Sequence, residues 1–238
     1  TFLSQSLGNQ KLTFLEHCRY RKCDGVIIAS VDFNNESVID LVKSDIPTIT
    51  IDYSFDNTSC VMSDNVEGAY ALTKYLIEKG HRRIAFIHGE MTSVTTKRLL
   101  GFYRAMSDYG VSVRDSYVVE GKYHDPLPSR KATRQLMEME EPPTAIMYPD
   151  DYSYLGGMVE LEKMKLSVPE DVSVVGYDGI PMSSILRPKL TTYYQDADRI
   201  GRMSARKLID KIENSKTCIA EEIKVSGKFA EGYSVKTV

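Results

Sequence analysis

The sequence predicts an α/β protein built on parallel sheets, and two observations carry this prediction. Short runs rich in β-branched residues alternate along the chain with segments whose apolar residues recur at helical spacing. Most of these runs are apolar throughout and do not alternate between apolar and polar residues. Strands of this kind are buried on both faces, which is typical of parallel sheets covered by helices on each side.

The predicted elements alternate regularly as far as Tyr177. Ser63 and Asp64 offer an N-cap for the helix that starts near Val66, and Gly80 ends that helix. In order, we expect strands at 26–29, 48–51, 84–87, 117–119, 145–148 and 172–177, separated by helices at 37–43, 66–79, 97–109, 129–139 and 154–165.

The pattern changes after Asp178. Pro181 and Pro188 interrupt regular structure, and the segment 190–194 (LTTYY) predicts a further strand. Residues 197–212 have the periodicity of an amphipathic helix, and 222–238 alternate as edge strands do. The C-terminal part is therefore expected to complete the sheets.

Polar residues follow several of the apolar runs. Ligands of parallel sheets bind beyond the carboxyl ends of the strands, so these residues are candidates for a binding site. They are Asp52, residues 89–98, Tyr123, Asp150, Asp151 and Asp178. Adjacent residues such as Asp150 and Asp151 point in opposite directions and are not expected to converge as an acid and base. We expect one to enter the ligand site and the other to cap the following helix.

The composition is that of a globular protein without an excess of positive charge. Of the 238 residues, 42% are apolar and 26% are charged, with 30 Lys and Arg against 33 Asp and Glu. A dedicated nucleic-acid-binding domain carries a basic excess, so these residues alone are not expected to hold DNA. The absence of an apolar run of about 18 residues excludes a predicted membrane-spanning helix.

The cysteines and the N-terminus bear on location. Cys18, Cys23, Cys60 and Cys218 show neither a CxxC pair nor the spacing of zinc ligands, which favours reduced thiols and a cytoplasmic location. The chain begins at Thr1 without a basic segment or a long apolar one. We therefore expect neither a signal peptide nor a natural start, but a chain that begins partway through its fold.

Common catalytic and cofactor-binding motifs are missing from the sequence. It contains no HExxH, no GxSxG, no P-loop and no GxGxxG followed by an acidic residue. The histidines, His17, His81, His88 and His124, are dispersed. We expect no enzyme activity, no cofactor and no metal site.

Eight segments occur in the order seen in bacterial LacI/GalR-type transcriptional regulators. They are 23–28 (CDGVII), 46–52 (IPTITID), 64–70 (DNVEGAY), 79–87 (KGHRRIAFI), 98–102 (RLLGF), 143–146 (PTAI), 168–178 (VPEDVSVVGYD) and 188–192 (PKLTT). From about residue 10 to about residue 213, the chain resembles the effector-binding domain of that family.

The resemblance implies a type I periplasmic-binding-protein-like fold. Two Rossmann-like parallel-sheet subdomains are joined in it by three crossovers, and a small ligand lies between them. Residues 1–62 and 194–222 would form the N-terminal subdomain, and 63–193 with 223–238 the C-terminal one. By comparison with the family, we expect the DNA-binding head and the first strand and helix of the N-terminal subdomain to be absent from this chain.

The resemblance also implies ligand-binding residues. Arg98 matches an arginine that grips the ligand, and its guanidinium can donate two parallel hydrogen bonds. Asp178 matches a hydrogen-bond acceptor, and Tyr123 falls where the family often places an aromatic ring against the ligand. Asp150 takes a position often held by Asn, and Gln195 matches a polar residue of a crossover strand.

Two segments depart from the family pattern. The loop that precedes Arg98 is about one residue shorter than in several relatives, which leaves the roles of Thr92, Ser93 and Thr95 open. Near the C-terminus, 229–233 (FAEGY) replaces the usual Arg-Gly-Ser/Thr, and nothing in the sequence explains that change.

The function expected from the resemblance is that of the effector-sensing, dimerising domain of a LacI-type repressor. It would bind a small polar ligand such as a sugar derivative between its subdomains and modulate operator binding through a helix-turn-helix outside this chain. Apolar positions on the helices at 37–43 and 66–79 are compatible with a homodimer.

Two other classes of protein remain as alternatives. A solute-binding protein of a sugar transporter is disfavoured by the unpaired cysteines and by the segment Gly80-His-Arg-Arg83. An α/β enzyme on a similar scaffold is disfavoured by the lack of a nucleophile and base or a metal constellation.

Overall fold

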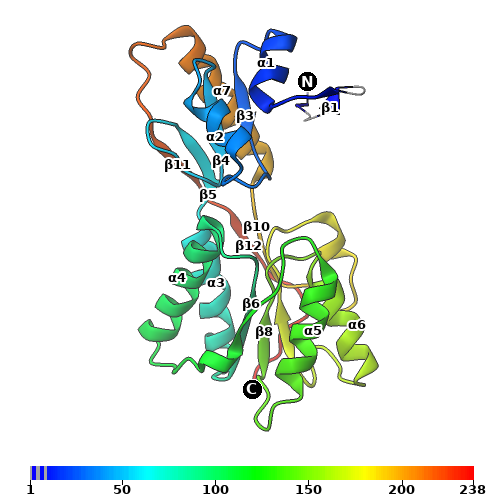
Figure 1. Ribbon diagram of the computed structural model, residues 1–238. Helices are drawn as coiled ribbons and strands as arrows, with labels where there is room; N and C mark the ends of the chain where they lie inside the picture. The colour runs from blue at the N-terminus through cyan, green and yellow to red at the C-terminus, as the bar shows by residue number, and fades with distance from the viewer. Residues whose placement is uncertain (1, 4–5, 8–9) are drawn as a thin grey trace. The chain divides into compact units, whose positions relative to one another are not determined.

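The computed structural model of the chain describes residues 2–3, 6–7 and 10–238 (Figure 1). The chain divides into two compact units. Thr1–Ser63 and Asp196–Val225 belong to the first unit, and Asp64–Gln195 and Ser226–Val238 to the second. The backbone therefore passes three times between units that each hold a parallel sheet, which confirms the predicted fold class.

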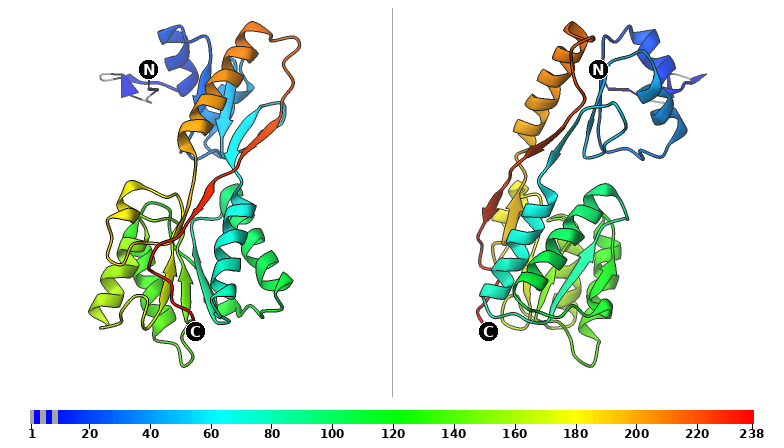
Figure 2. Two further views of the ribbon diagram at one scale, coloured as in Figure 1. Left: turned by 180° about the vertical axis from the view of Figure 1, so that it is seen from behind. Right: turned by 90° about the vertical axis from the view of Figure 1, so that its left-hand side faces the viewer.

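The first unit is a four-stranded parallel sheet between helices. Its strands are β3 (Val26–Ile28), β4 (Thr48–Ile51), β5 (Cys60–Ser63) and β11 (Glu222–Val225), in the order β11-β5-β4-β3. Helices α1 (Phe14–Arg21) and α2 (Glu36–Lys43) cover one face, and α7 (Ala197–Glu213) covers the other (Figure 2). The short strands β1 (Ser6–Leu7) and β2 (Gln10–Lys11) form a separate antiparallel pair.

The second unit repeats this arrangement with a larger core. Strands β6 (Ile84–His88), β7 (Val118–Glu120), β8 (Ala145–Met147) and β9 (Ser173–Val175) are parallel, in the order β7-β6-β8-β9. Two isolated bridges place β10 (Thr192–Tyr194) beside β9, and β10 also pairs antiparallel with β12 (Lys228–Ala230). Helices α3 (Asn65–Glu78) and α4 (Ser93–Asp108) lie on one face, and α5 (Pro126–Met137) and α6 (Tyr154–Lys163) on the other (Figure 1). The 3-10 turns η1 (Asp115–Tyr117) and η2 (Pro181–Ser184) join these elements.

The two faces of this sheet explain why its central strand β6 is apolar at four consecutive positions, 84–87. Along β6, Ile84 and Phe86 pack into the core under α3 and α4, whereas Ala85 and Ile87 pack under α5 and α6. Successive residues of a strand point to opposite faces, so a strand covered on both sides has no solvent-facing position.

Helix starts differ from the predicted ones because N-caps lie further upstream. The helix expected at 97–109 begins at Ser93, since the Thr92 side chain accepts a hydrogen bond from the Thr95 N–H. The helix expected at 129–139 begins at Pro126, with Asp125 accepting from the Leu127 N–H.

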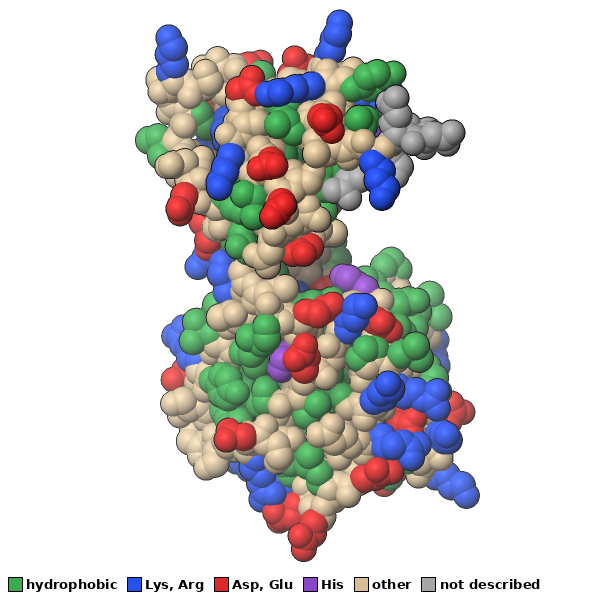
Figure 3. Space-filling view, viewed as in Figure 1, with side chains coloured by type: hydrophobic (Ala, Val, Ile, Leu, Met, Phe, Trp, Pro, Cys, Tyr) green, Lys and Arg blue, Asp and Glu red, His purple; other side chains and the backbone are tan. Residues whose placement is uncertain are grey.

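Charged side chains of both signs are interspersed over the face of each unit seen in Figure 3. This distribution agrees with the small net charge of −3. Over residues 2–3, 6–7 and 10–238, no helix has both the length and the apolar character needed to cross a membrane.

Candidate functional site

Arg98 lies at the centre of a group of polar side chains in the second unit. It belongs to α4, and its side chain is only 4% exposed. Its Nε donates to Asn65 Oδ1 at 2.9 Å, and its Nη1 donates to the Pro149 carbonyl at 2.7 Å. A buried cation held by two oriented acceptors has little freedom to move, so the direction of its guanidinium is set before any ligand arrives.

Two aromatic rings and a carboxylate complete the surroundings of this guanidinium. Its central carbon lies 3.5 Å from the centroid of the Tyr177 ring and 5.3 Å from that of Tyr123. The Nη2 atom lies 3.6 Å from Asp178 Oδ1. The aromatic faces and the carboxylate all stabilise the positive charge.

Asp178 and Gln195 are held together where β9 and β10 end. The backbone N–H of Gln195 donates to the Asp178 carbonyl at 3.0 Å, and Gln195 Nε2 donates to Asp178 Oδ1 at 2.5 Å. Burial raises the pKa of Asp178, and the Arg98 guanidinium opposes that rise. The Asp178 backbone has a φ of 95°, an uncommon conformation for a residue other than Gly that is found preferentially at functional sites.

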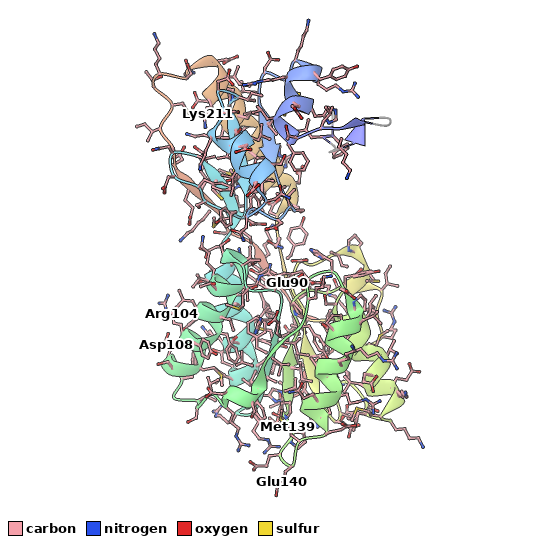
Figure 4. All side chains as sticks on the ribbon, in the orientation of Figure 1. Glu90, Arg104, Asp108, Met139, Glu140 and Lys211 are labelled. Carbon is pink, nitrogen blue, oxygen red and sulfur yellow. The ribbon has the colours of Figure 1, made fainter. Side chains whose placement is uncertain are left out.

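Tyr123 stands on the loop that follows β7. Its hydroxyl lies 2.9 Å from Thr95 Oγ1, and its backbone N–H donates to Glu90 Oε2 at 3.0 Å. Figure 4 shows Glu90 at the end of the sheet where the loops gather. A Cβ at Gly89 would approach the Tyr123 ring to 2.1 Å, so this ring needs a glycine beneath it. Of the three loop residues left open by the sequence, Thr95 contacts the site directly through the Tyr123 hydroxyl.

Asp150 is buried and serves as an acceptor between two loops. Its oxygens accept from the Ser153 N–H at 2.7 Å, the Ser153 hydroxyl at 2.8 Å and the His124 N–H at 2.9 Å. The carboxylate thus ties the loop that carries Tyr123 to the loop after β8. Direct contact between Asp150 and a ligand stays a prediction.

Asp151 is also buried, but its carboxylate contacts other segments than that of Asp150 does. Its oxygens accept from the Ile180 N–H at 3.0 Å and from the Thr192 hydroxyl at 2.6 Å. It therefore fastens the loop that carries Asp178.

The N-cap residue of α6 is Ser153, whose side chain makes no capping bond. Of the two carboxylates, Asp150 makes the bonds expected of a cap in the turn that leads into α6, since it accepts from the Ser153 N–H and its carbonyl accepts from the Tyr154 N–H.

We expect Asp151 to make stability depend on pH. Burial raises its pKa from 3.8 to about 7, with the Asp178 charge adding to the rise and the Thr192 hydrogen bond opposing it. The folded state then binds the proton more tightly than the unfolded state. Its contribution to stability is complete below the unfolded pKa and is lost as the pH rises through about 7.

Urea unfolding of wild type and Asp151→Asn between about pH 5 and about pH 8 checks this expectation. The wild type should lose more stability with rising pH than the variant, whose amide does not titrate. Asp40→Asn, at an exposed position of α2, is the control and should follow the wild type. Parallel curves for wild type and Asp151→Asn would show that Asp151 is already ionised in the folded protein at the lower pH.

One group of possible metal ligands lies within the same site. Among the residues that the structure describes, His124, Asp150 and Asp178 each bring one ligand atom within 4.8 Å of the others. The Arg98 guanidinium already faces Asp178, and the Asp150 oxygens accept three hydrogen bonds. These contacts suit a guanidinium-centred site for a polar ligand better than a metal centre.

Sequence reasoning missed the side chains of Asn65 and Tyr177 as contacts of Arg98. Asn65 begins α3, and its position directly after the N-cap gave no sign that its side chain turns inward. Tyr177 belongs to an apolar run and was predicted only as part of a strand. A further aromatic group lies in the first unit, where Phe33 stacks on Tyr53 with centroids 4.7 Å apart and Phe55 packs beside them. These rings follow β3 and β4, at the carboxyl ends of those strands.

Comparison with known proteins gives consistent matches. The family model of a periplasmic binding protein-like domain matches residues 73–235. The chain is 31% identical over 205 residues to an HTH-type transcriptional repressor PurR from Aliivibrio salmonicida, covering 84% of this chain and 61% of the relative. It is 30% identical over 229 residues to a repressor of the same name from Mannheimia succiniciproducens, covering 94% of this chain and 68% of the relative. The chain thus spans about three fifths of the length of the first of these relatives.

The solved structures that match this chain include regulators of the LacI family. A transcriptional regulator LacI from Bacillus cereus subsp. cytotoxis matches with a TM-score of 0.86 and 29% identity, over 94% of this chain and 80% of that chain. A LacI family transcriptional regulator from Enterococcus faecium, solved with bound ribose, matches with a TM-score of 0.83 and 26% identity, over 95% of this chain and 84% of that chain.

Proposed function

This chain belongs to the LacI family of transcriptional regulators as a ligand-binding domain, and we propose that it senses a small polar molecule through Arg98, Tyr123 and Asp178. The observation that carries the proposal is the convergence of these side chains at the carboxyl ends of the strands of one parallel sheet. Such sheets bind their ligands at that end.

We propose a sugar or a sugar derivative as the ligand. Asp178 and Gln195 offer hydrogen-bond acceptors, Arg98 offers donors and Tyr123 offers a ring face, which together suit a hydroxylated ring. The Asp178 carboxylate lies 3.6 Å from the Arg98 guanidinium and offsets its charge, which favours a neutral polyol over a dianion. Ribose in the regulator from Enterococcus faecium supports this class of ligand.

The proposed biological role is regulation of DNA binding by a homodimer of the whole regulator. A ligand changes DNA affinity only as far as it binds two conformations with different affinities. The names of the relatives favour this role over a transporter's solute-binding protein. We also propose that the ligand leaves unchanged, since Asp150 and Asp151 are held by structural hydrogen bonds and are not poised as an acid and base.

The homodimer can be tested on this chain. We expect light scattering at tens of micromolar (~10⁻⁵ M) to give twice the mass of one chain, because that concentration exceeds the dissociation constants of stable protein pairs. A single-chain mass at that concentration would contradict a dimer formed by this domain alone.

Calorimetric titration with sugars, sugar phosphates and nucleobases tests the ligand site. Asp178→Asn keeps the shape of the side chain but removes its charge and one acceptor, so we expect the affinity for the ligand that binds to fall about 100-fold. Asp40→Asn should bind like the wild type. If no compound of the panel binds, or if Asp178→Asn binds as tightly as the wild type, the proposed site is wrong.

A further inference from the structure

Two of the four cysteines lie against each other at the C-terminus of α1. Cys18 belongs to the last turns of that helix, and Cys23 follows the turn that leaves it. Cys23 packs on the buried cluster that contains Cys18. The spacing of five residues hid this contact, because it is not the spacing of a CxxC motif.

The backbone explains why these two side chains meet. Lys22 adopts a left-handed conformation with φ 53°, its N–H donates to the Arg19 carbonyl, and the Cys23 N–H donates to the Cys18 carbonyl at 3.0 Å. This pair of bonds is the Schellman motif, which brings the side chains of its first and last residues into contact. A disulfide requires Cα atoms about 4.4–6.8 Å apart and side chains directed at each other, which a turn of this kind allows.

Only one of the two cysteines is exposed to solvent. Cys18 is fully buried, whereas Cys23 is partly exposed. Cys23 also lines a cavity of about 440 Å³, together with apolar residues that include Phe14, Val26 and Leu41. A reagent from solution therefore meets Cys23 first.

The Cys18 thiol also holds its proton tightly. Burial, with the Cys23 sulfur adding to it, raises the pKa of the Cys18 thiol to about 11. Cys18 therefore keeps its proton near neutral pH, which makes it a poor nucleophile for an external disulfide. Arg19, Arg21 and Lys22 lie in the same turn and attract an anionic reagent.

We propose that Cys18 and Cys23 form a dithiol that closes to an intramolecular disulfide by exchange with a low-molecular-weight disulfide. The Cys23 thiolate attacks one sulfur of the external disulfide and expels its first thiolate. Cys18 then gives its proton to water or buffer and attacks the Cys23 sulfur, expelling the second thiolate. The two cysteines are oxidised and the external disulfide is reduced to two thiols, so that atoms and electrons balance. The product ties the end of α1 to the segment that leads into β3.

Incubation of the full chain with oxidised glutathione at about pH 8, followed by alkylation, trypsin digestion and mass spectrometry, tests this proposal. Arg19, Arg21 and Lys22 lie between the two cysteines, so trypsin separates them and the disulfide appears as a cross-linked pair of peptides. In the wild type we expect this pair to exceed the glutathione adduct of Cys23 at least about tenfold, because closure is intramolecular. Cys218, which is partly exposed, serves as an internal control for the reagent.

Two variants separate the roles of the sulfur atoms. In Cys18→Ser the first step proceeds but the second cannot, so a stable glutathione adduct should accumulate on Cys23. In Cys23→Ser, Cys18 should stay a free thiol, because the reagent does not reach it. Wild-type protein that carries a glutathione adduct on Cys218 but shows no cross-link between the Cys18 and Cys23 peptides would overturn the proposal. Reaction of Cys18 in Cys23→Ser would overturn the order of the two steps.

Discussion

Replacing Arg98 with Met is expected to lower the free energy of unfolding by about 3–5 kcal/mol, the usual cost of removing one partner from a buried ion pair. The side chain is 4% exposed, and its removal leaves Asn65 Oδ1, the Pro149 carbonyl and the Asp178 carboxylate without the cation that they face. The ligand that binds the wild type should lose at least about 100-fold in affinity, since the donor of the site is gone.

Arg104→Met is the matched control for this expectation. Arg104 lies on the same helix, but its side chain is 64% exposed and its partner Asp108 lies 3.8 Å away on the surface (Figure 4). Exposed pairs contribute about 0–1 kcal/mol, so this variant should unfold like the wild type. Urea unfolding and calorimetric titration of both variants decide the matter. If Arg98→Met were as stable as Arg104→Met, the contacts of Arg98 would not hold the loops together.

A comparison at about pH 4.5, with both proteins folded, separates the structural role of Arg98 from that of the charge on Asp178. Arg98 opposes the raised pKa of Asp178, so without it the carboxyl group should protonate more readily and stay neutral to a higher pH. The stability lost in Arg98→Met should therefore be smaller at the acidic pH than at neutral pH. If the loss of stability is equal at both pH values, the whole effect comes from packing and from the hydrogen bonds to Asn65 Oδ1 and the Pro149 carbonyl.

The parallel sheet of the second unit could be predicted because its central strands β6 and β8 are apolar at consecutive positions. Ile84–Ile87 is apolar at each position, and the polar residues that follow the strands converge because the carboxyl ends of parallel strands meet at one edge. This is why Arg98, Tyr123 and Asp178 could be placed near one another from their positions in the chain, whereas Gln195 was named only from the resemblance to the family.

The remaining parts of the fold and the site depend on contacts that are distant in sequence. Strand β5 is central in its sheet, but the segment Cys60-Val-Met-Ser63 is too short and too mixed to predict a strand without its neighbours β4 and β11. Helix α1 is largely polar and only two of its residues, His17 and Cys18, are buried, so no apolar periodicity marks it. Asn65 and Arg98 meet because α3 and α4 pack side by side, which no local pattern reveals.

Gly156→Ala is expected to destabilise the second unit by about 2–3 kcal/mol, although alanine is the better helix former by about 1 kcal/mol. A Cβ at Gly156 in α6 would lie 1.8 Å from the Pro126 carbonyl oxygen and 3.0 Å from the Arg130 backbone nitrogen. Both atoms belong to the backbone of α5, so relief requires the two helices to move apart and to loosen the core beneath them.

The substitution Gly201→Ala should have the opposite effect on stability. Gly201 lies within α7, and a Cβ there would meet nothing within 4 Å, so only the helix preference counts and stability should rise by up to about 1 kcal/mol. Each change should be measured on the unfolding transition of the unit that carries it, because the two units need not unfold together. Opposite signs would show that the close approach of α5 and α6 needs glycine at Gly156. A gain in stability in both variants would mean that α5 and α6 lie further apart than the distances from Gly156 indicate.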